Sequence, residues 1–351
     1  MVNVYLNQIA TAVPEHDLHK KFIDFAPRLL KDPRRRDLFE RMVKRAQIEH
    51  RYSFLKPHPE KGKIDLDGFY QPGNFPDTQK RMEVYKQNAF HLAKRALDQL
   101  DFSKISSSIT HLIITTCTGF YAPGLDLEIV NHYKLKSSVE RTIIGFMGCY
   151  AAFNALKMAS HIVRSEPNAK VAVLNLELCS LHLKETENLE ELLSFLIFAD
   201  GCAASIISSE PVGMELQKFY AEVLPNSSDQ ITWHIGGLGF DMVLSGRVPL
   251  TITNTLPSAL ARILDAKSIE DIRHWAIHPG GRSIIDAIQS CIGLPEPLLQ
   301  TSRDVLRRFG NMSSASIMFV LKEMMESISG QGCAMAFGPG VTVESMLFRS
   351  V

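Results

Sequence analysis

Cys149 is the residue of this sequence best placed to act as a nucleophile. It follows Gly148 and precedes an alanine-rich run in which Ala152, Leu156 and Ala159 share one helical face. The apolar segment 141–146 before it is predicted to be a buried strand. A cysteine between a strand and a helix start is open to substrate among small neighbours, and the helix N-terminus favours its thiolate. The same pattern also fits a cysteine packed in the core, where this residue type is often found.

His278 and Asn311 lie at comparable points later in the chain. His278 ends a strand-like segment and opens HPGGR, whereas Asn311 opens a helix rich in small residues. The spacing from Cys117 to Cys149 is 149 − 117 = 32 residues, and that from His278 to Asn311 is 311 − 278 = 33. The chain is therefore predicted to contain an internal repeat, in which Cys149 and Asn311 occupy equivalent helix starts facing one site.

These three residues form a possible Cys-His-Asn set. An imidazole beside a thiol acts as its base and holds the pair as thiolate and imidazolium, and an amide N–H stabilises an oxyanion or enolate. Taken singly, His278 is one of twelve histidines and Asn311 fits a simple helix N-cap. A Cys-His-Asn protease fits poorly, because papain-like chains do not duplicate a βαβ frame.

Composition limits the function classes further. The 351 residues are 45% hydrophobic, enough for one large domain or two mid-sized halves, and 38 basic residues balance 38 acidic ones. Zero net charge gives no field that favours nucleic acid or an anionic membrane. The sequence shows neither a signal-peptide pattern nor an apolar run of membrane-spanning length. The six cysteines form no CxxC pair, so we expect no metal site, no disulfide framework and a reduced cytoplasmic protein.

Alternating strands and helices indicate an α/β fold with mostly parallel sheets covered by helices. We predict an N-terminal half, residues 1–210, that carries the cysteine, and a C-terminal half, residues 211–351, that carries the histidine and asparagine. Strands are expected at 2–12, 111–117, 141–146, 170–178, 198–209, 213–223, 274–278, 332–337 and 343–349. Helices are expected at 18–48, 79–100, 126–133, 152–159, 189–197 and 283–292 and after Gly310, and 52–77 is expected to be a loop.

The motifs GFMGCYAA, FADGCAA, GLGF, HPGG, GNMSSAS and AFGPGVTVES resemble those of type III polyketide synthases, the chalcone synthase superfamily. This resemblance covers nearly the whole chain. It implies a thiolase-like αβαβα fold, with two duplicated halves around a pseudo-twofold axis, and a homodimer. Cys149, His278 and Asn311 match the family's catalytic triad. Phe198 and Phe240 match its two gatekeeper phenylalanines, although Ala199 replaces a glycine of the F-G-D-G pattern.

The resemblance also implies substrates and their contacts. An acyl-CoA would load Cys149, and malonyl-CoA would extend the chain by decarboxylative condensation without a further cofactor. Arg41 and Arg45, with the adjacent Lys44, match positions that bind CoA phosphates, and Ser283 matches a backbone contact to pantetheine. A third basic position of the family is Leu38 here.

Several positions are implied to line the substrate cavity: Cys117, Ala122, Cys179, His182, Ile231, Ser313, Phe337, Gly338 and Pro339. Ala122 matches a residue that enters the partner subunit's cavity. The motifs TGFYAPGLDLEIV and LELCSLH look most like bacterial long-chain alkylpyrone and alkylresorcinol synthases, so a medium or long fatty acyl starter is expected. Two alternatives stay open: a synthase using malonyl-CoA or another small starter to make a hydroxylated aromatic such as tetrahydroxynaphthalene, and a thiolase-fold binding subunit without catalysis.

Overall fold

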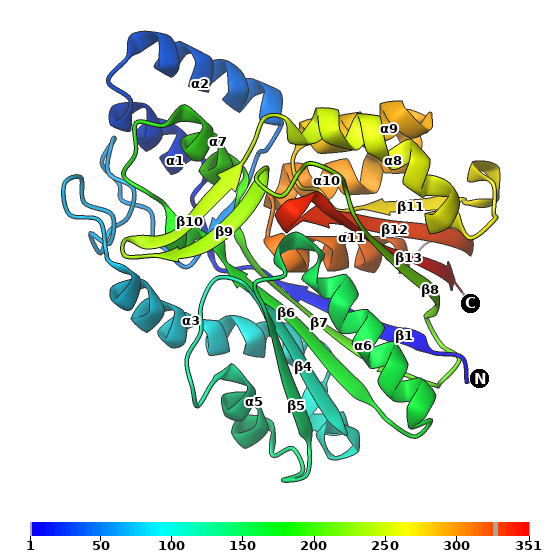
Figure 1. The fold of residues 1–351 in the computed structure, drawn as a ribbon. Helices are drawn as coiled ribbons and strands as arrows, with labels where there is room; N and C mark the ends of the chain where they lie inside the picture. The colour runs from blue at the N-terminus through cyan, green and yellow to red at the C-terminus, as the bar shows by residue number, and fades with distance from the viewer. Residues whose placement is uncertain (1, 326–328, 351) are drawn as a thin grey trace.

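One nine-stranded sheet runs through the molecule and draws strands from both halves of the chain (Figure 1). The computed structural model describes residues 2–325 and 329–350, and the strand order is β11-β12-β13-β8-β1-β7-β6-β4-β5. The first half contributes β1 (Tyr5–Ala12), β4 (His111–Thr116), β5 (Glu140–Gly145), β6 (Val171–Leu178) and β7 (Asp200–Ser208). The second half contributes β8 (Met214–Val223), β11 (His274–Ile277), β12 (Gly330–Gly338) and β13 (Thr342–Ser350). Short pairing between β1 and β8 joins the two parts.

The pairing pattern confirms a mixed sheet but differs from the prediction that it is mostly parallel. Only β4–β5, β4–β6 and β11–β12 pair in parallel, whereas the other five neighbouring pairs are antiparallel. The antiparallel strand β7 is buried along its whole length and β13 along most of it, because helices cover both faces. Burial on two faces therefore does not require parallel pairing. The boundary at residue 210 stays a prediction, since both halves share the sheet.

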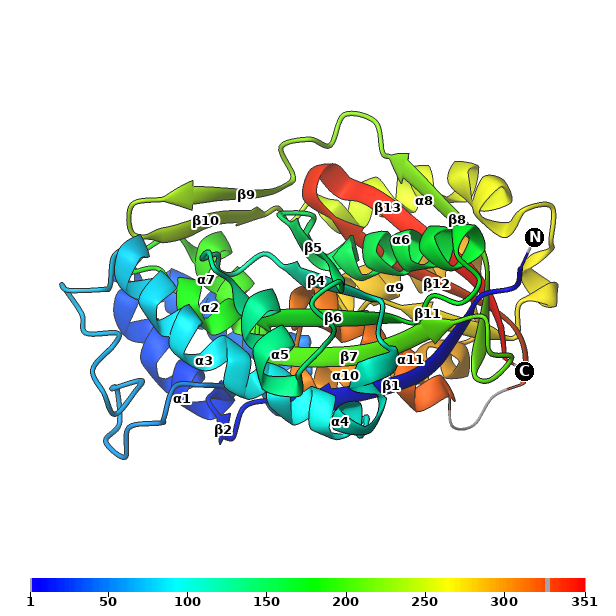
Figure 2. The ribbon, with the colours of Figure 1, turned by 90° about the horizontal axis from the view of Figure 1, so that it is seen from below.

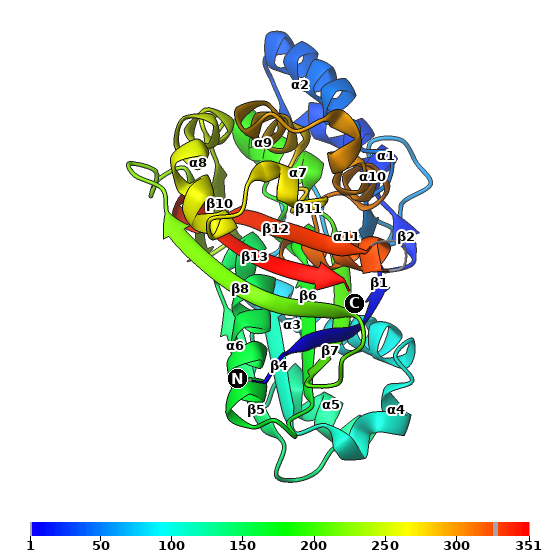
Figure 3. The ribbon, with the colours of Figure 1, turned by 90° about the vertical axis from the view of Figure 1, so that its right-hand side faces the viewer.

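Helices and sheet alternate in five layers. In the middle lie α6 (Ala151–Ser165) and α11 (Ser316–Met325). They pack between the strands that the first half of the chain contributes, such as β6 with Val173, and those that the second half contributes, such as β12 with Ala334. One outer layer holds α3 (Thr78–Asp98), α4 (Phe102–Ile105) and α5 (Leu125–Tyr133), and the other holds α8 (Val248–Leu264) and α9 (Arg282–Ile292) with α10 (Gln300–Phe309) beside it. Figures 2 and 3 show these outer groups on opposite sides. The predicted αβαβα architecture is confirmed.

A separate cap covers the end of the sheet where the site lies (Figure 1). It consists of α1 (His19–Phe25), α2 (Pro33–Ala46) and α7 (Leu189–Ile197), with the hairpin β9 (Ile231–Gly236) and β10 (Gly239–Leu244) beside them. The helix predicted over 18–48 is interrupted before α2, where the side chain of Asp32 caps the new helix by accepting from the Arg34 N–H. A minor pair of two-residue strands, β2 (His16–Asp17) and β3 (Tyr52–Ser53), closes this region.

Strand β5 differs from the prediction in its burial. Residues 141–146 were expected to be buried, but Glu140, Arg141, Thr142 and Ile143 are exposed, because β5 is the edge strand and pairs only with β4. Within the part of the chain that the structure describes, no helix has both the length and the hydropathy needed to cross a bilayer.

Candidate active site

The two repeats bring equivalent points of the chain to one place. Strand β4 ends just before Cys117 and β11 just before His278. Cys149 lies in the 3-10 turn η3 (Gly148–Tyr150) that leads into α6, and Asn311 comes just before the equivalent turn η7 (Ser313–Ala315), which leads into α11. The internal repetition predicted from the spacings of 32 and 33 residues is therefore present in the fold.

Gly280 connects the three predicted catalytic residues. The Asn311 Nδ2 lies 3.9 Å from the Cys149 Sγ and 3.4 Å from the Gly280 carbonyl oxygen. The Gly280 N–H donates to the His278 carbonyl at 2.8 Å, and a Cβ at Gly280 would stand 3.4 Å from the His278 Cδ2. The Asn311 Oδ1 accepts from the Ser313 N–H at 2.8 Å, which leaves Nδ2 turned toward the sulfur. A carbonyl group placed beside Gly280 would thus meet both an amide donor and an imidazole.

Burial favours the neutral form of both reactive groups. Desolvation raises the pKa of the Cys149 thiol to about 11, although hydrogen bonds with Ser313 and Asn311 oppose the shift. His278 is 2% exposed, and desolvation lowers its pKa to about 3. Neither ring nitrogen of His278 has a hydrogen-bond partner among the described residues. Both shifts favour a neutral thiol and a neutral imidazole over the predicted thiolate–imidazolium pair, which stays a prediction.

A small apolar cavity of about 50 Å³ adjoins the Cys149 sulfur. It brings together seven of the predicted residues: Cys117, Cys149, Cys179, Phe198, Ile231, Ser313 and Pro339. Phe195 of α7 and Trp233 and Met242 of the hairpin β9–β10 also line it and were missed, because no local pattern shows that these two elements fold over the cysteine.

The other predicted cavity residues lie outside this lining. His182 stacks on Phe240, and neither is among the residues that line the cavity, although Phe240 packs against Trp233, which does line it. Phe337 is buried in the core of the second half, whereas Gly338 lies beside the nucleophile, since a Cβ there would be 3.4 Å from the Cys149 N. Ala122 is exposed on the loop after β4 and does not line the cavity of its own chain.

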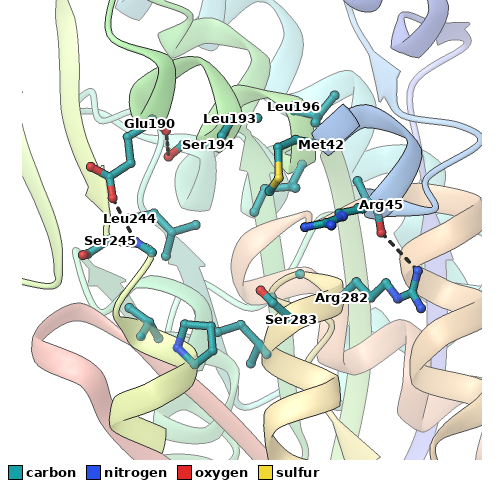
Figure 4. Close-up of a pocket in the computed structure, with 18 of the residues that line it drawn as sticks. Met42, Arg45, Glu190, Leu193, Ser194, Leu196, Leu244, Ser245, Arg282 and Ser283 are labelled. Atoms are coloured by element: carbon teal, nitrogen blue, oxygen red, sulfur yellow. Dashed lines mark hydrogen bonds between the residues drawn. The ribbon is translucent and has the colours of Figure 1, made fainter. Parts of the chain in front are cut away.

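A larger hollow of about 590 Å³ opens from Gly280 to the surface between α2, α7 and α9 (Figure 4). Arg45 and Ser283, two of the predicted CoA contacts, line it on facing sides. Arg282, which the sequence reasoning missed, donates to the Arg45 carbonyl at 3.4 Å. Lys44 lines a neighbouring hollow, and Arg41 lies in neither. The entrance therefore leads from basic side chains to the carbonyl that Asn311 contacts.

Comparison with known proteins now decides the family. Residues 5–211 match the chalcone and stilbene synthase N-terminal domain, and residues 215–351 match the corresponding C-terminal domain. The chain belongs to the chalcone and stilbene synthase family. It is a type III polyketide synthase and thus an acyltransferase-type enzyme.

Individual type III polyketide synthases are similar to this chain over nearly its whole length. The chain is 34% identical over 360 residues to the "alpha-pyrone synthesis polyketide synthase-like Pks18" of Mycobacterium tuberculosis, covering 97% of this chain and 89% of that protein. It resembles the crystal structure of PKS-I from the brown alga Ectocarpus siliculosus with a TM-score of 0.88 and 28% identity, covering 100% and 99% of the two chains. The type III domain of Steely1 from Dictyostelium shares the fold, with a TM-score of 0.89 at 24% identity and 99% coverage of both chains.

Glu177 is a further residue of the synthase that sequence reasoning missed. It is fully buried at the end of β6, where desolvation raises its pKa to about 7. Its carboxylate accepts from the Cys117 N–H and the Thr118 hydroxyl at 2.9 Å each and from the Ser314 hydroxyl at 2.6 Å. The signal was a lone acidic residue in the mostly apolar strand VAVLNLEL. Glu177 thus ties the end of β4 to the turn that follows Asn311.

Proposed function

We propose that this synthase loads a medium- or long-chain fatty acyl group from its CoA thioester onto Cys149, extends it with malonyl-CoA and cyclises the product to an alkylpyrone or alkylresorcinol. The observation that carries the proposal is the contact of Asn311 with both Cys149 and Gly280, because Gly280 also adjoins His278 and lines the hollow of Arg45 and Ser283. The name of the mycobacterial relative, which refers to alpha-pyrone synthesis, supports the product class.

Loading begins with proton transfer from the Cys149 thiol to His278, whose free ring nitrogens accept it. The thiolate attacks the acyl-CoA carbonyl, and the CoA thiolate leaves with the proton that His278 returns. Proton transfer during the reaction is consistent with two groups that are neutral beforehand, because separated charges in this buried site would be costly. The Arg45 and Arg282 guanidinium groups near the entrance would attract the CoA phosphates.

Extension uses the same donors on malonyl-CoA. The Asn311 Nδ2 and a His278 N–H would hold the thioester carbonyl and stabilise the enolate left when carbon dioxide departs. The carbanion then attacks the Cys149 thioester, forming a carbon–carbon bond and releasing the sulfur. No separate cofactor enters the proposal, because decarboxylation itself supplies the electron pair. A binding subunit without catalysis would not need all three residues at this point.

The small cavity favours a second candidate. A volume of about 50 Å³ holds only a few carbon atoms, far below the roughly 300–1,000 Å³ typical of ligand pockets. A long alkyl chain therefore requires movement of lining side chains or space from a partner subunit. A synthase that starts from malonyl-CoA and makes a hydroxylated aromatic needs less room.

A homodimer is part of the proposal. The exposed edge of β5 adjoins the loop that carries Ala122, since a Cβ at Gly124 would lie 3.7 Å from the Ile143 Cδ1. Ile143 is 43% and Phe120 36% exposed there. An unpaired edge with apolar side chains favours pairing with another chain. The six free cysteines support the predicted cytoplasmic location.

A competition assay with short and long acyl-CoA starters tests the proposal. Purified enzyme receives malonyl-CoA together with an equimolar mixture of acetyl-CoA and medium- and long-chain acyl-CoA, and the products are identified by mass spectrometry. We expect pyrones or resorcinols that carry the long alkyl chain. Products built from malonyl-CoA alone, in the presence of all starters, would replace the long-chain proposal with the small-starter enzyme.

A further inference from the structure

Two buried arginines lie behind the predicted gatekeepers, Phe198 and Phe240. Arg51 is 5% exposed and Arg81 is 0% exposed. Across residues 2–325 and 329–350, neither guanidinium has a carboxylate partner, and the Nη2 of each has no hydrogen-bond partner at all. Asp17 and Asp200 favour the charged form of Arg51 only from beyond direct contact. Because a buried charge without a direct ion pair is costly, the carbonyl oxygens that each guanidinium binds are its main compensation.

Arg51 holds the end of α7, which carries the first gatekeeper. Its Nη1 donates to the carbonyl oxygens of Phe195 and Phe198 at 2.7 Å each, where the helix leaves carbonyl groups unpaired and its dipole favours a cation. Its Nε donates to the His19 Nδ1 at 2.9 Å. Burial lowers the pKa of His19 to about 3, so this imidazole is a neutral acceptor. The guanidinium thus sits between the cap and the gatekeeper.

The same contact reaches the catalytic amide. Phe198 and Asn311 form an isolated parallel bridge, in which the Asn311 N–H donates to the Ile197 carbonyl at 2.8 Å and the Ala199 N–H donates to the Asn311 carbonyl at 2.9 Å. Gly310 lies against the Arg51 stem, because a Cβ there would stand 2.9 Å from the Arg51 Cγ. Displacement of Arg51 would therefore move the backbone of Phe198 and of Asn311 together.

Arg81, on α3, supports the second gatekeeper in a similar way. Its Nη1 donates to the carbonyl oxygens of Leu181 and Leu183, the latter at 3.0 Å. Between them, His182 stacks on the Phe240 ring with centroids 4.2 Å apart and accepts from the Phe240 N–H at 3.1 Å. A Cβ at Gly239 would come within 2.7 Å of the Arg81 Nε, so this glycine lets the hairpin lie directly on the guanidinium.

We propose that Arg51 and Arg81 are positioning residues that hold the two gatekeepers at set distances from Cys149, with Arg51 also fixing Asn311. The proposal rests on the proposed synthase function and on the match of Phe198 and Phe240 to the gatekeeper positions of the family. A planar guanidinium presents several donors in a fixed geometry, whereas the lysine ammonium is a compact point charge on a flexible stem. Lysine at either position would therefore restore the charge without restoring the angle between the two carbonyl bonds.

The test compares Arg51→Met, Arg51→Lys, Arg81→Met and Arg81→Lys with Arg164→Met as the control. Arg164 also donates to two backbone carbonyls, those of Leu216 and Gln217 at 3.3 Å each, but it contacts β8 and not the gatekeepers. For each enzyme we would measure thermal melting, acylation of Cys149, malonyl-CoA decarboxylation and product length. A fifth readout is independent of polyketide synthesis: the rate at which a bulky maleimide modifies Cys149 relative to iodoacetamide.

Arg51→Met is expected to keep Cys149 acylation and to lower the decarboxylation kcat by roughly tenfold, or ~1.4 kcal/mol of transition-state stabilisation. The maleimide-to-iodoacetamide ratio should rise in both methionine variants, and Arg51→Lys should lie between Arg51→Met and wild type. Arg81→Met should retain decarboxylation but release chains of altered length. Arg164→Met should match wild type in every readout except melting.

Two results would overturn the inference. One is a folded Arg51→Met enzyme with wild-type decarboxylation and a wild-type reagent ratio. The other is an equal loss of acylation and decarboxylation in Arg51→Met that the control Arg164→Met also shows. If the methionine variants do not fold, the same readouts on the lysine variants decide. A wild type that forms no polyketide would refute the proposed function instead, and the reagent ratio at Cys149 would still show whether the arginines position the gate.

Discussion

Asn311 gives the sharpest test of how the active site divides its work. Its Oδ1 accepts from the Ser313 N–H at 2.8 Å and from the Ser316 hydroxyl at 3.5 Å, so this atom supports the turn before α11. Its Nδ2 makes only long contacts, 3.4 Å to Gly280 and 3.9 Å to the Cys149 sulfur. The oxygen is thus structural, and the N–H₂ group is available to the substrate.

Loss of the Asn311 Nδ2 donor should lower the rate of decarboxylation, whereas loss of the Oδ1 acceptor should lower folding stability. Without the Nδ2 donor, decarboxylation should fall by about 10²–10³, the ~2.7–4 kcal/mol typical of one oxyanion-hole donor. Asn311→Ala also loses the bond to Ser313, which costs about 1 kcal/mol of folding stability. Asn311→Asp keeps that acceptor but places a carboxyl group at a position that is 1% exposed, so it should also lose stability while decarboxylation falls as far. Its new charge beside the sulfur disfavours the thiolate and should slow loading as well.

Intact-mass spectrometry after incubation with an acyl-CoA measures loading, and release of acetyl-CoA from malonyl-CoA measures decarboxylation. Asn154→Ala is the matched control, because it removes an α6 amide that donates to Glu344 at 2.8 Å away from the site. Asn311→Ala should load Cys149 at near the wild-type rate. Equal loss of loading and decarboxylation in this variant, with the control unaffected, would show that the amide is only structural.

Three other substitutions test the entrance, the buried carboxyl and the cavity. Arg45→Ala should raise KM for acyl-CoA with little change in kcat, whereas Arg41→Ala, outside the entrance, should leave KM unchanged. Steady-state kinetics at low and high salt checks both, because salt screening should shrink the difference in KM between Arg45→Ala and wild type. Glu177 has a folded pKa of about 7 against an ordinary 4.5, so its favourable contribution is complete below pH 4.5 and is lost as pH rises through 7. The melting temperature of Glu177→Gln should therefore rise progressively relative to that of wild type from pH 4.5 to 7. A melting-temperature difference that does not change with pH would show that the pKa of Glu177 is not raised. Cys117→Phe, which fills the cavity beside Cys149, should cut kcat/KM more for long starters than for acetyl-CoA, since each buried methylene contributes roughly 0.8 kcal/mol; an unchanged chain-length profile would argue against this route for the chain.

The sequence could predict the frame of the site because the frame is local. A strand end, a tight turn and a helix start are encoded within about ten residues around Cys149. The spacing from His278 to Asn311 nearly equals that from Cys117 to Cys149, which reveals the repeat. The basic composition of α2 likewise points to the entrance. Only the resemblance to the family, however, distinguishes Phe198 and Phe240 from other phenylalanines.

Features that depend on distant packing could not be predicted in this way. Helix α8 contains Pro257 and many threonines, yet Ile252, Leu256 and Ala259 pack it against the second half of the sheet. The segment of β5 is apolar enough for a core strand, and only the strand order makes it an edge. The raised pKa of Cys149 follows from its burial, to which the hairpin and cap contribute, and no local pattern shows that burial.

The most direct test of the account is the location of the acyl group after loading. The cavity contains three thiols, Cys117, Cys149 and Cys179, so the chemistry of the thiol alone does not select among them. Wild-type enzyme, Cys149→Ala and Cys117→Ala would be incubated with a fatty acyl-CoA, digested and mapped by mass spectrometry. We predict one thioester, on Cys149, in wild type and Cys117→Ala, and no adduct or polyketide in a folded Cys149→Ala enzyme. An acyl group on Cys117 or Cys179 in wild type, or polyketide formation by Cys149→Ala, would contradict the central claim.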